Sequence, residues 1–330
     1  MPAGESGRLV ERVRVLYPRW KAIEREVVRC HEMSPFAAES QCLLIVGPTA
    51  VGKTTLAASY ALRYPRIETE TGVEMPVLHA TIPTAATVKD LSEELLSALG
   101  DPRASLGTTG QKTRRLSGFM CDCGTRLLIL DETQHFVDRD SRRVLLNASN
   151  WLKTLVKETG VACVLVGLEG EAESVVNTNP QLARLFGDPL VLAPFEWDEE
   201  RPATVEESRT FLGHLERLLP LRESSHLADT DTAHRIFLAS DGLMSHVMAL
   251  VRGATHLALA RGSERLELDL LAAAFDHRLA GRRRGVVNPF QGELPTVGER
   301  ISPRPVEATN RRSRARGPRR ERLADILGSR

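Results

Sequence analysis

The stretch GPTAVGKTTL, Gly47 to Leu56, follows the apolar run CLLIV and decides the fold class of this 330-residue chain. Its pattern is Gly-x-x-x-x-Gly-Lys-Thr, placed between a predicted strand and a predicted helix. Glycines let backbone N–H groups close around phosphates, and the N-terminus of the helix adds positive potential. The stretch therefore predicts a phosphate-binding loop made of Gly47, Pro48, Thr49, Ala50, Val51, Gly52, Lys53, Thr54 and Thr55.

The loop and a second apolar run together predict ATP and Mg²⁺ as ligands. Lys53 is expected to reach the β- and γ-phosphates, and the Thr54 hydroxyl is expected to bind Mg²⁺. The run RLLILD ends in Asp131, followed by Glu132. Asp131 is expected to hold the water shell of Mg²⁺, and Glu132 to polarise the attacking water. This pair predicts that the nucleotide can be hydrolysed.

Arg184 is a candidate for catalysis in trans. The segment NPQLARLFGDPLVL places it at the end of a predicted short helix, directly before the last predicted strand. In ring-forming ATPases a cationic side chain at this position reaches the γ-phosphate of a neighbouring subunit and stabilises developing charge. An isolated arginine can equally be a solvated surface residue.

Apolar runs and helical stretches alternate through the first two thirds of the chain. The runs at 42–47, 75–83, 126–131, 161–167 and 189–195 predict five strands of a mainly parallel sheet with helices on both faces. After 195 the pattern is helical throughout. We expect an N-terminal helical appendage at 1–41, an α/β nucleotide-binding domain at 42–195, a helical lid at 196–281 and a C-terminal tail at 282–330.

The distribution of charge separates the tail from the body of the protein. Residues 282–330 contain 13 Arg, no Lys and 5 acidic residues, although the whole chain has a net charge of only +1. A basic, Pro-rich and disordered arm for DNA or a partner protein is predicted, and a merely solubilising tail is the alternative.

Five cysteines favour reduced thiols over a disulfide framework. No membrane span or secretory signal is apparent, which favours a bacterial cytoplasmic location.

The chain resembles the TnsC/TniB group of AAA+ transposition regulators, which includes members from CRISPR-associated transposons. The resemblance covers roughly residues 9–280 and is closest to TniB-type members. It rests on LYPRW, LLIVGPTAVGKTTL, MPVLHATIPTAATVKDLSEELLSALGDP, RLLILDETQHF, VACVLVGLEG, NPQLARLF and the pattern of the lid. The nucleotide motifs are shared by many ATPases, whereas DETQHF and the lid are more specific.

The resemblance implies an AAA+ fold and an ATP-dependent ring or helical filament on double-stranded DNA. Such an oligomer marks the target site, recruits a DDE transposase, answers to a TniQ-like or CRISPR effector target-selection protein, and disassembles on hydrolysis. Two departures put the rate of hydrolysis in doubt. The fourth strand is followed by Leu168 where a polar sensor is common, and the lid offers Ser245 and His246 where an arginine sensor is common.

The DNA contacts expected from the resemblance lie after the second long strand. Thr87 and Lys89 are the first candidates, and Lys112, Arg114 and Arg115 in GQKTRRLSG are the second group. Basic side chains there would neutralise phosphates and give a salt-dependent affinity with little sequence preference. A lysine on a solvated helix face is the alternative.

Two other functions remain open from the sequence. One is a helicase loader or replication initiator with the same ATPase core. The other is a nucleotide-gated DNA-binding scaffold with negligible turnover, suggested by the two missing sensor side chains.

Overall fold

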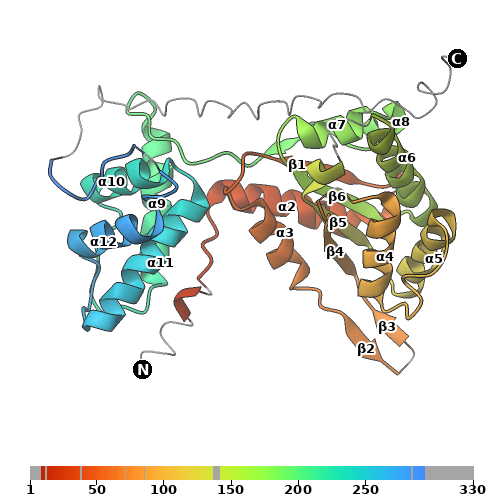
Figure 1. Cartoon of the computed structure of the whole chain (residues 1–330), viewed down its shortest axis with the longest axis horizontal. Coiled ribbons are helices and arrows are strands. Elements are labelled where there is room, and N and C mark those ends of the chain that lie inside the picture. The colour runs from red at the N-terminus through yellow and green to blue at the C-terminus, as the bar shows by residue number, and fades with distance from the viewer. Residues whose placement is uncertain are drawn as a thin grey trace, which may run out of the picture. The chain divides into compact units, whose positions relative to one another are not determined.

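The computed structural model describes residues 9–11, 13–37, 39–70, 72–84, 86–136, 142–283 and 285–293 (Figure 1). Of the predicted basic tail, residue 284 and residues 294–330 lie outside this described part, as do 1–8, 12 and 38 of the predicted appendage. No single helix in the described part is long and apolar enough to cross a membrane. Helices α10, Thr230–Ser240, and α11, Met244–Arg261, meet the length and composition only as a pair, with a bend of 116° between them.

The centre of the protein is a five-stranded parallel sheet, which confirms the predicted fold class. Each of the five predicted apolar runs contributes one strand. Their order across the sheet is β4-β5-β6-β1-β7, so the chain crosses over between neighbouring strands. The bounds are β1 Cys42–Val46, β4 Val77–Thr81, β5 Leu127–Asp131, β6 Ala162–Gly167 and β7 Leu190–Val191.

Both faces of the sheet are buried, because successive side chains along each strand point to opposite faces. Ile45, Ile129 and Val164 pack on one face with α2 and α3. Leu44 and Leu128 pack on the other face with α4, α5, α6 and α7. The helices are α2 Pro18–Met33, α3 Lys53–Ala61, α4 Val88–Leu99, α5 Thr109–Asp122, α6 Arg142–Thr159 and α7 Glu171–Asn177.

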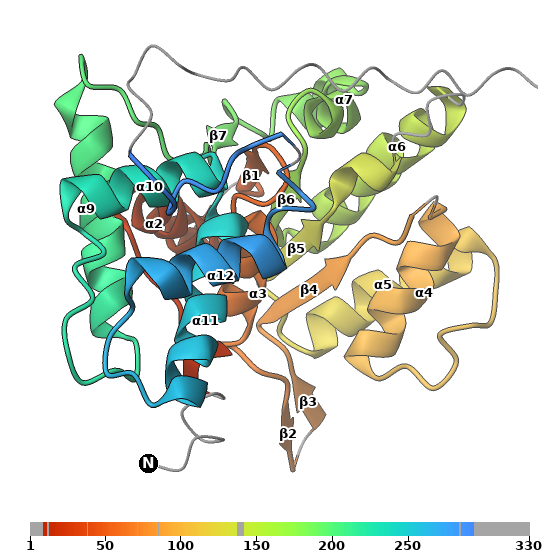
Figure 2. The same cartoon turned by 60° about the vertical axis from the view of Figure 1, so that its left-hand side comes forward.

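A group of four helices follows the sheet, and its apolar residues continue the core that α2 and α3 form (Figures 1 and 2). Helices α11 and α12 pack against each other, and α10 packs against α11. Two consecutive residues with positive φ, Asp241 and Gly242, separate α10 from α11. The helices are α9 Pro202–Arg217, α10 Thr230–Ser240, α11 Met244–Arg261 and α12 Leu268–Arg278.

The sequence analysis did not predict several elements. A short antiparallel hairpin, β2 with β3, is formed almost entirely by exposed residues and projects beside β4 (Figure 2). Helix α5 packs against α4. The bounds are β2 Ile67–Thr69, β3 Gly72–Glu74, and the short helices η1 Ser34–Phe36 and η2 Thr133–Phe136. The short helix predicted before Arg184 is present as α8 Pro180–Ala183.

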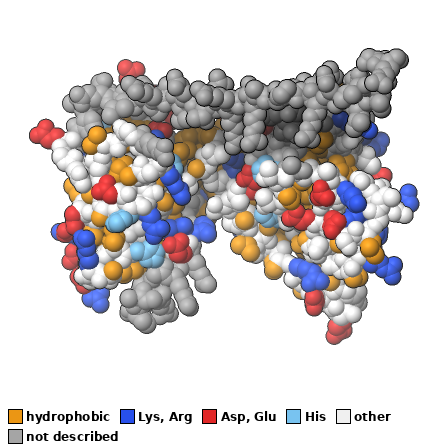
Figure 3. Space-filling view, viewed as in Figure 1, with side chains coloured by type: hydrophobic (Ala, Val, Ile, Leu, Met, Phe, Trp, Pro, Cys, Tyr) orange, Lys and Arg blue, Asp and Glu red, His pale blue; other side chains and the backbone are white. Residues whose placement is uncertain are grey.

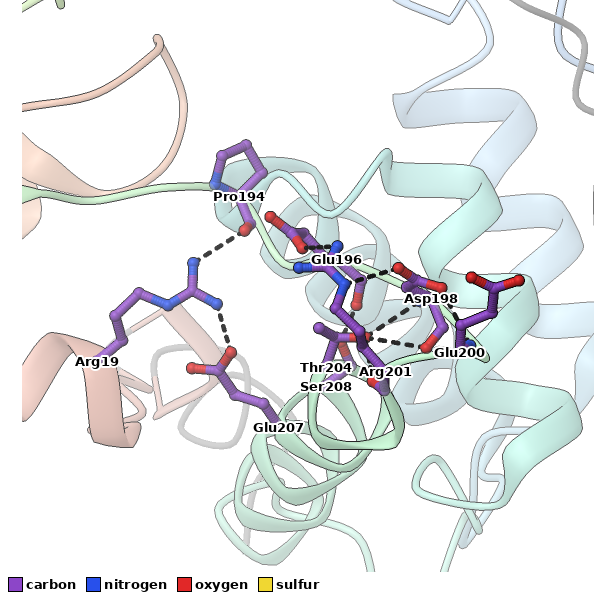
Figure 4. Close-up of polar contacts among 9 residues, drawn as sticks. All are labelled: Arg19, Pro194, Glu196, Asp198, Glu200, Arg201, Thr204, Glu207 and Ser208. Carbon is purple, nitrogen blue, oxygen red and sulfur yellow. Dashed lines mark hydrogen bonds and ion pairs between the residues drawn. The ribbon is translucent and has the colours of Figure 1, made fainter.

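Arg19, at the start of α2, joins three segments that are distant in sequence. Its guanidinium donates hydrogen bonds of 3.0 Å to the carbonyl oxygens of Ala193 and Pro194 and forms an ion pair with Glu207 of α9. Figure 4 shows the Arg19 side chain pointing toward Pro194 and Glu207. Next to it, the Tyr17 ring packs against Phe195 and Phe211. The N-terminal helix is therefore fastened both to the segment that leaves the sheet and to the first helix of the lid.

Candidate nucleotide site

The predicted phosphate-binding loop lies between β1 and α3, at the carboxyl end of the parallel strands. A Cβ atom on Gly47 would lie 2.2 Å from the carbonyl oxygen of Leu192, so only glycine fits there. Ala50 and Gly52 both have positive φ, 72° and 102°. These conformations turn the chain tightly before the first helical N–H groups, which is the geometry that surrounds phosphates.

Lys53 is the first residue of α3, and its side chain lies back over the loop. The ammonium donates hydrogen bonds of 2.8 Å to the carbonyl oxygens of Gly47 and Pro48. Burial lowers its pKa, whereas the nearby carboxylates of Glu132 and Asp131 act in the opposite direction. The lysine is therefore held beside the loop and beside the end of β5, where it can exchange carbonyl partners for phosphate oxygens.

Asp131 is the last residue of β5 and is almost completely buried, with 1% of its surface exposed. One carboxylate oxygen, Oδ1, accepts a hydrogen bond of 2.9 Å from the backbone N–H of Glu132. The other, Oδ2, has no hydrogen-bond partner among the described residues. A buried carboxylate oxygen without a partner is costly unless a cation or a water molecule satisfies it. This oxygen fits an Mg²⁺ site, in which one or two protein ligands act together with substrate phosphates.

Glu132 follows with a φ of 59°, a left-handed conformation that is uncommon for a residue with a side chain. Its carboxylate is half-buried and accepts a hydrogen bond from the side-chain amide of Gln134. The Glu132 carboxylate is close enough to Lys53 to raise the pKa of that lysine, opposing the effect of burial. The sequence analysis did not single out Gln134, although it stands two residues away in the quoted motif DETQHF.

The lid touches the loop directly. The backbone N–H of Ser245, in the first turn of α11, donates a hydrogen bond of 2.9 Å to the carbonyl oxygen of Ala50. The preceding residue, Met244, places its Cγ 3.7 Å from where a Cβ of Gly52 would lie. His246 bonds instead within the lid, to the carbonyl oxygen of Ser240, and burial lowers its pKa. The lid thus meets the loop through the first turn of α11.

Arg184 caps the C-terminus of the short helix α8 and is exposed. Its guanidinium takes part in no hydrogen bond or ion pair that the structure gives within the described ranges. An exposed cation without a partner among the described residues is available to a neighbouring molecule. Its predicted role in trans stays a prediction.

The structure separates the five candidate DNA contacts into two groups. Thr87, Lys89 and Arg114 are exposed. Lys112 is fully buried, and its ammonium lies 2.5 Å from a carboxylate oxygen of Glu93. Its expected role as a phosphate contact is therefore corrected, because the charge is already used to join α5 to α4.

Arg115 is also occupied. Its guanidinium pairs with Asp101 at 3.0 Å and donates to the carbonyl oxygens of Arg103 and Leu106. It fastens the loop between α4 and α5 to α5. The Arg115 side chain stays partly exposed, and its expected DNA contact remains a prediction. The face in Figure 3 shows Lys and Arg side chains interspersed with Asp and Glu.

Comparison with known proteins places this geometry in context. A family model described as "Bacterial TniB protein" matches residues 8–196. Among curated proteins, none matches the chain. Solved structures with the same fold include the Orc2 protein of Aeropyrum pernix in ADPNP-ADP complexes, with 19% identity and a TM-score of 0.57 over 82% of this chain and 71% of that chain.

Two further structures share the fold. The Orc1 protein of Aeropyrum pernix in complex with DNA has 18% identity and a TM-score of 0.56 over 80% of this chain and 66% of that chain. Cdc6p of Pyrobaculum aerophilum has 13% identity and a TM-score of 0.58 over 82% and 71%. These similarities show the AAA+ fold of P-loop nucleotide-binding proteins. The family match spans more than half of the chain, and this chain therefore belongs to the TniB family.

Proposed function

We propose that this protein is an ATP-dependent regulator of DNA transposition, which assembles on double-stranded DNA when ATP is bound and disassembles when ATP is hydrolysed. Membership of the TniB family supports the connection with transposition. The observation that carries the proposal is the contact between Ser245 of the lid and Ala50 of the phosphate-binding loop. Because the lid rests on the loop, phosphates bound there can affect the position of the lid and of the surfaces that meet the next subunit.

In this proposal the residues of the loop and of β5 divide the work. Backbone N–H groups of the loop surround the phosphates, and Lys53 moves from the carbonyl oxygens of Gly47 and Pro48 to the β- and γ-phosphates. Thr54 and Asp131 would hold Mg²⁺, which would neutralise charge at the phosphates. The Glu132 carboxylate orients the attacking water and accepts its proton. Arg184 of one subunit faces the γ-phosphate held by the next.

Duplex DNA is the proposed track for the homo-oligomer, a ring or a helical filament. Thr87, Lys89 and Arg114 are the proposed contacts, because each side chain is exposed near α4 or α5. A DDE transposase and a target-selection protein, TniQ-like or a CRISPR effector, are the proposed partners. The basic tail from 282 onward is proposed to contact transposase or DNA, on the basis of its 13 arginines.

Phosphate release tests the enzymatic part of the proposal. Wild-type protein, Lys53→Ala and Glu132→Gln are compared with and without duplex DNA and transposase, while binding of a fluorescent ATP analogue is measured in parallel. We expect turnover in the wild type, raised by DNA or transposase, only a small residual turnover in Glu132→Gln, and nucleotide binding in Glu132→Gln but not in Lys53→Ala. Turnover equal to that of Glu132→Gln under every condition would instead identify a nucleotide-gated scaffold. Association with a replicative helicase in place of transposase would identify a helicase loader.

A further inference from the structure

Gln134 lies between the proposed general base and the end of the neighbouring strand. Its side-chain Nε2 donates a hydrogen bond to Oε2 of Glu132. Its side-chain Oε1 accepts a hydrogen bond of 3.2 Å from the backbone N–H of Leu168, directly after β6. A backbone N–H can only donate and an ionised carboxylate can only accept. The two partners therefore fix which end of the amide faces which group.

The surroundings leave this amide little freedom. A Cβ atom on Gly167 would lie 2.9 Å from Oγ1 of Thr133 and 3.0 Å from Oε1 of Gln134, so glycine is needed for η2 to approach β6. The Thr133 hydroxyl donates to the carbonyl oxygen of Val166, which fastens the same approach from the other side. The position of Gln134 is thus determined by the end of β6.

The hydrogen bond between Leu168 and Gln134 supplies a polar group at the end of β6. The first residue after β6 is Leu168, whose side chain is apolar. The Leu168 side chain has no polar atom, but its backbone N–H donates a hydrogen bond to Oε1 of Gln134. The polar side chain near the end of β6 comes from η2 instead of from β6 itself.

We propose that Gln134 is a positioning residue, which holds the Glu132 carboxylate in place and passes movement at the end of β6 to it. The segment after β6 leads into α7 and α8, which ends at the exposed Arg184. A neighbouring subunit that shifts this segment would move the N–H of Leu168 and, through Gln134, the proposed base. The inference rests on the proposed hydrolysis of ATP and adds a route by which assembly can control it.

Gln134→Met tests the role, because methionine keeps the length of the side chain and removes both polar atoms. We expect kcat for phosphate release to fall about tenfold to 100-fold, the effect typical of losing a group that orients a reacting one. KM and the affinity for a fluorescent ATP analogue should stay within about twofold of wild type. The matched control is Gln181→Met, because Gln181 is an exposed residue of α8 whose side-chain amide bonds only Lys153 among the described residues. It should leave kcat unchanged.

A double-mutant comparison separates positioning from general damage to the fold. In the Glu132→Gln background, adding Gln134→Met should cause no further loss of turnover, because the residue acts through Glu132. A further loss there, a weaker nucleotide affinity, or an unchanged or raised kcat in the single variant would overturn the inference.

Amide hydrogen exchange gives a readout that needs no turnover. In nucleotide-free protein, the peptide containing Leu168 should exchange faster in Gln134→Met than in wild type or Gln181→Met, since its acceptor is lost. Unchanged exchange would also overturn the inference. Failure of the proposed function looks different: wild type itself would release phosphate no faster than Glu132→Gln.

Discussion

The backbone N–H of Ser245 donates a hydrogen bond of 2.9 Å to the carbonyl oxygen of Ala50, and this bond joins the first turn of the lid helix α11 to the phosphate-binding loop. Ala50 itself has a positive φ. The two residues are almost 200 positions apart, and the bond depends on the turn that brings α11 to the loop. The lid and the loop therefore form one structural unit in this protein.

The turn before α11 predicts an effect of Gly242→Ala. A Cβ there would lie 2.0 Å from the carbonyl oxygen of Phe195. Phe195 cannot easily move away, because its backbone N–H donates a hydrogen bond to the carbonyl oxygen of Gly242. We expect the free energy of unfolding to fall by more than about 2 kcal/mol, measured by urea denaturation. Gly262→Ala is the matched control, with a similar φ of 70° and nothing within 4 Å of the added Cβ. It should cost about 1 kcal/mol. Equal losses would contradict this account of the turn.

The contacts of Arg19 predict that Arg19→Met lowers the stability of the protein around this residue. Loss of its hydrogen bonds to Ala193 and Pro194 and of its ion pair with Glu207 should lower the free energy of unfolding by about 1–3 kcal/mol. Hydrogen exchange should rise between 193 and 207. Arg201→Met is the control, because within the described ranges that exposed side chain pairs only with Glu196 and Asp198 beside it (Figure 4). A loss of stability of similar size in Arg201→Met would show that the contacts of Arg19 contribute no more than those of a surface arginine.

His31 predicts a pH dependence of stability. The ring is buried, bonds to the Tyr60 hydroxyl at 2.9 Å and packs edge-on against Tyr64. Burial lowers the pKa of His31 to about 4, and Arg126 adds to the effect. Because the folded pKa lies below the unfolded value of about 6.5, its contribution is present above pH 6.5 and is lost as the pH falls toward 4. Between pH 7 and 5 the loss should be about 1–2 kcal/mol.

The control for this effect is His31→Phe, which keeps an aromatic ring without a titrating group. Chemical denaturation at pH 7 and pH 5 should show a smaller loss of stability in His31→Phe than in wild type. An identical pH dependence in both proteins would show that His31 is not responsible.

DNA binding by the exposed basic residues predicts a change in salt dependence. Lys89→Ala and Arg114→Ala should each reduce the slope of log K against log salt concentration by about 0.9, the value for one lost phosphate contact on duplex DNA. Fluorescence anisotropy with duplexes of unrelated sequence measures the slope. Lys112→Met should leave it unchanged and lower the stability instead, since Lys112 is buried against Glu93. A reduced slope in Lys112→Met alone would reverse the assignment.

Much of the fold could be predicted from local sequence. Strands β1, β5 and β6 were recognisable because each is a short apolar run that is almost entirely buried. The loop was recognisable because glycines and a lysine stand at fixed spacing. Helix α5 was missed because only Leu116 and Met120 of its apolar side chains are fully buried. Its one local signal is the capping box between Thr108 and Gln111.

The site was only partly predictable, for a physical reason. Lys112 and Arg115 read as surface charges because their acidic partners, Glu93 and Asp101, lie one helix away, and pairing at that distance depends on how α4 and α5 pack. Gln134 was missed for a similar reason. Its second partner is the backbone N–H of Leu168, and a contact to a backbone group cannot be recognised from the types of residues in the sequence.

The central claim is that bound ATP drives assembly on duplex DNA. Electron microscopy of purified protein with duplex DNA and a non-hydrolysable ATP analogue tests it most directly, with Lys53→Ala and Glu132→Gln beside the wild type. We predict rings or spirals that enclose DNA for the wild type with the analogue. Glu132→Gln should form them with ATP itself and keep them, whereas Lys53→Ala should form none. Persistent monomers of the wild type, or assembly of Lys53→Ala at the same nucleotide concentration, would contradict the account.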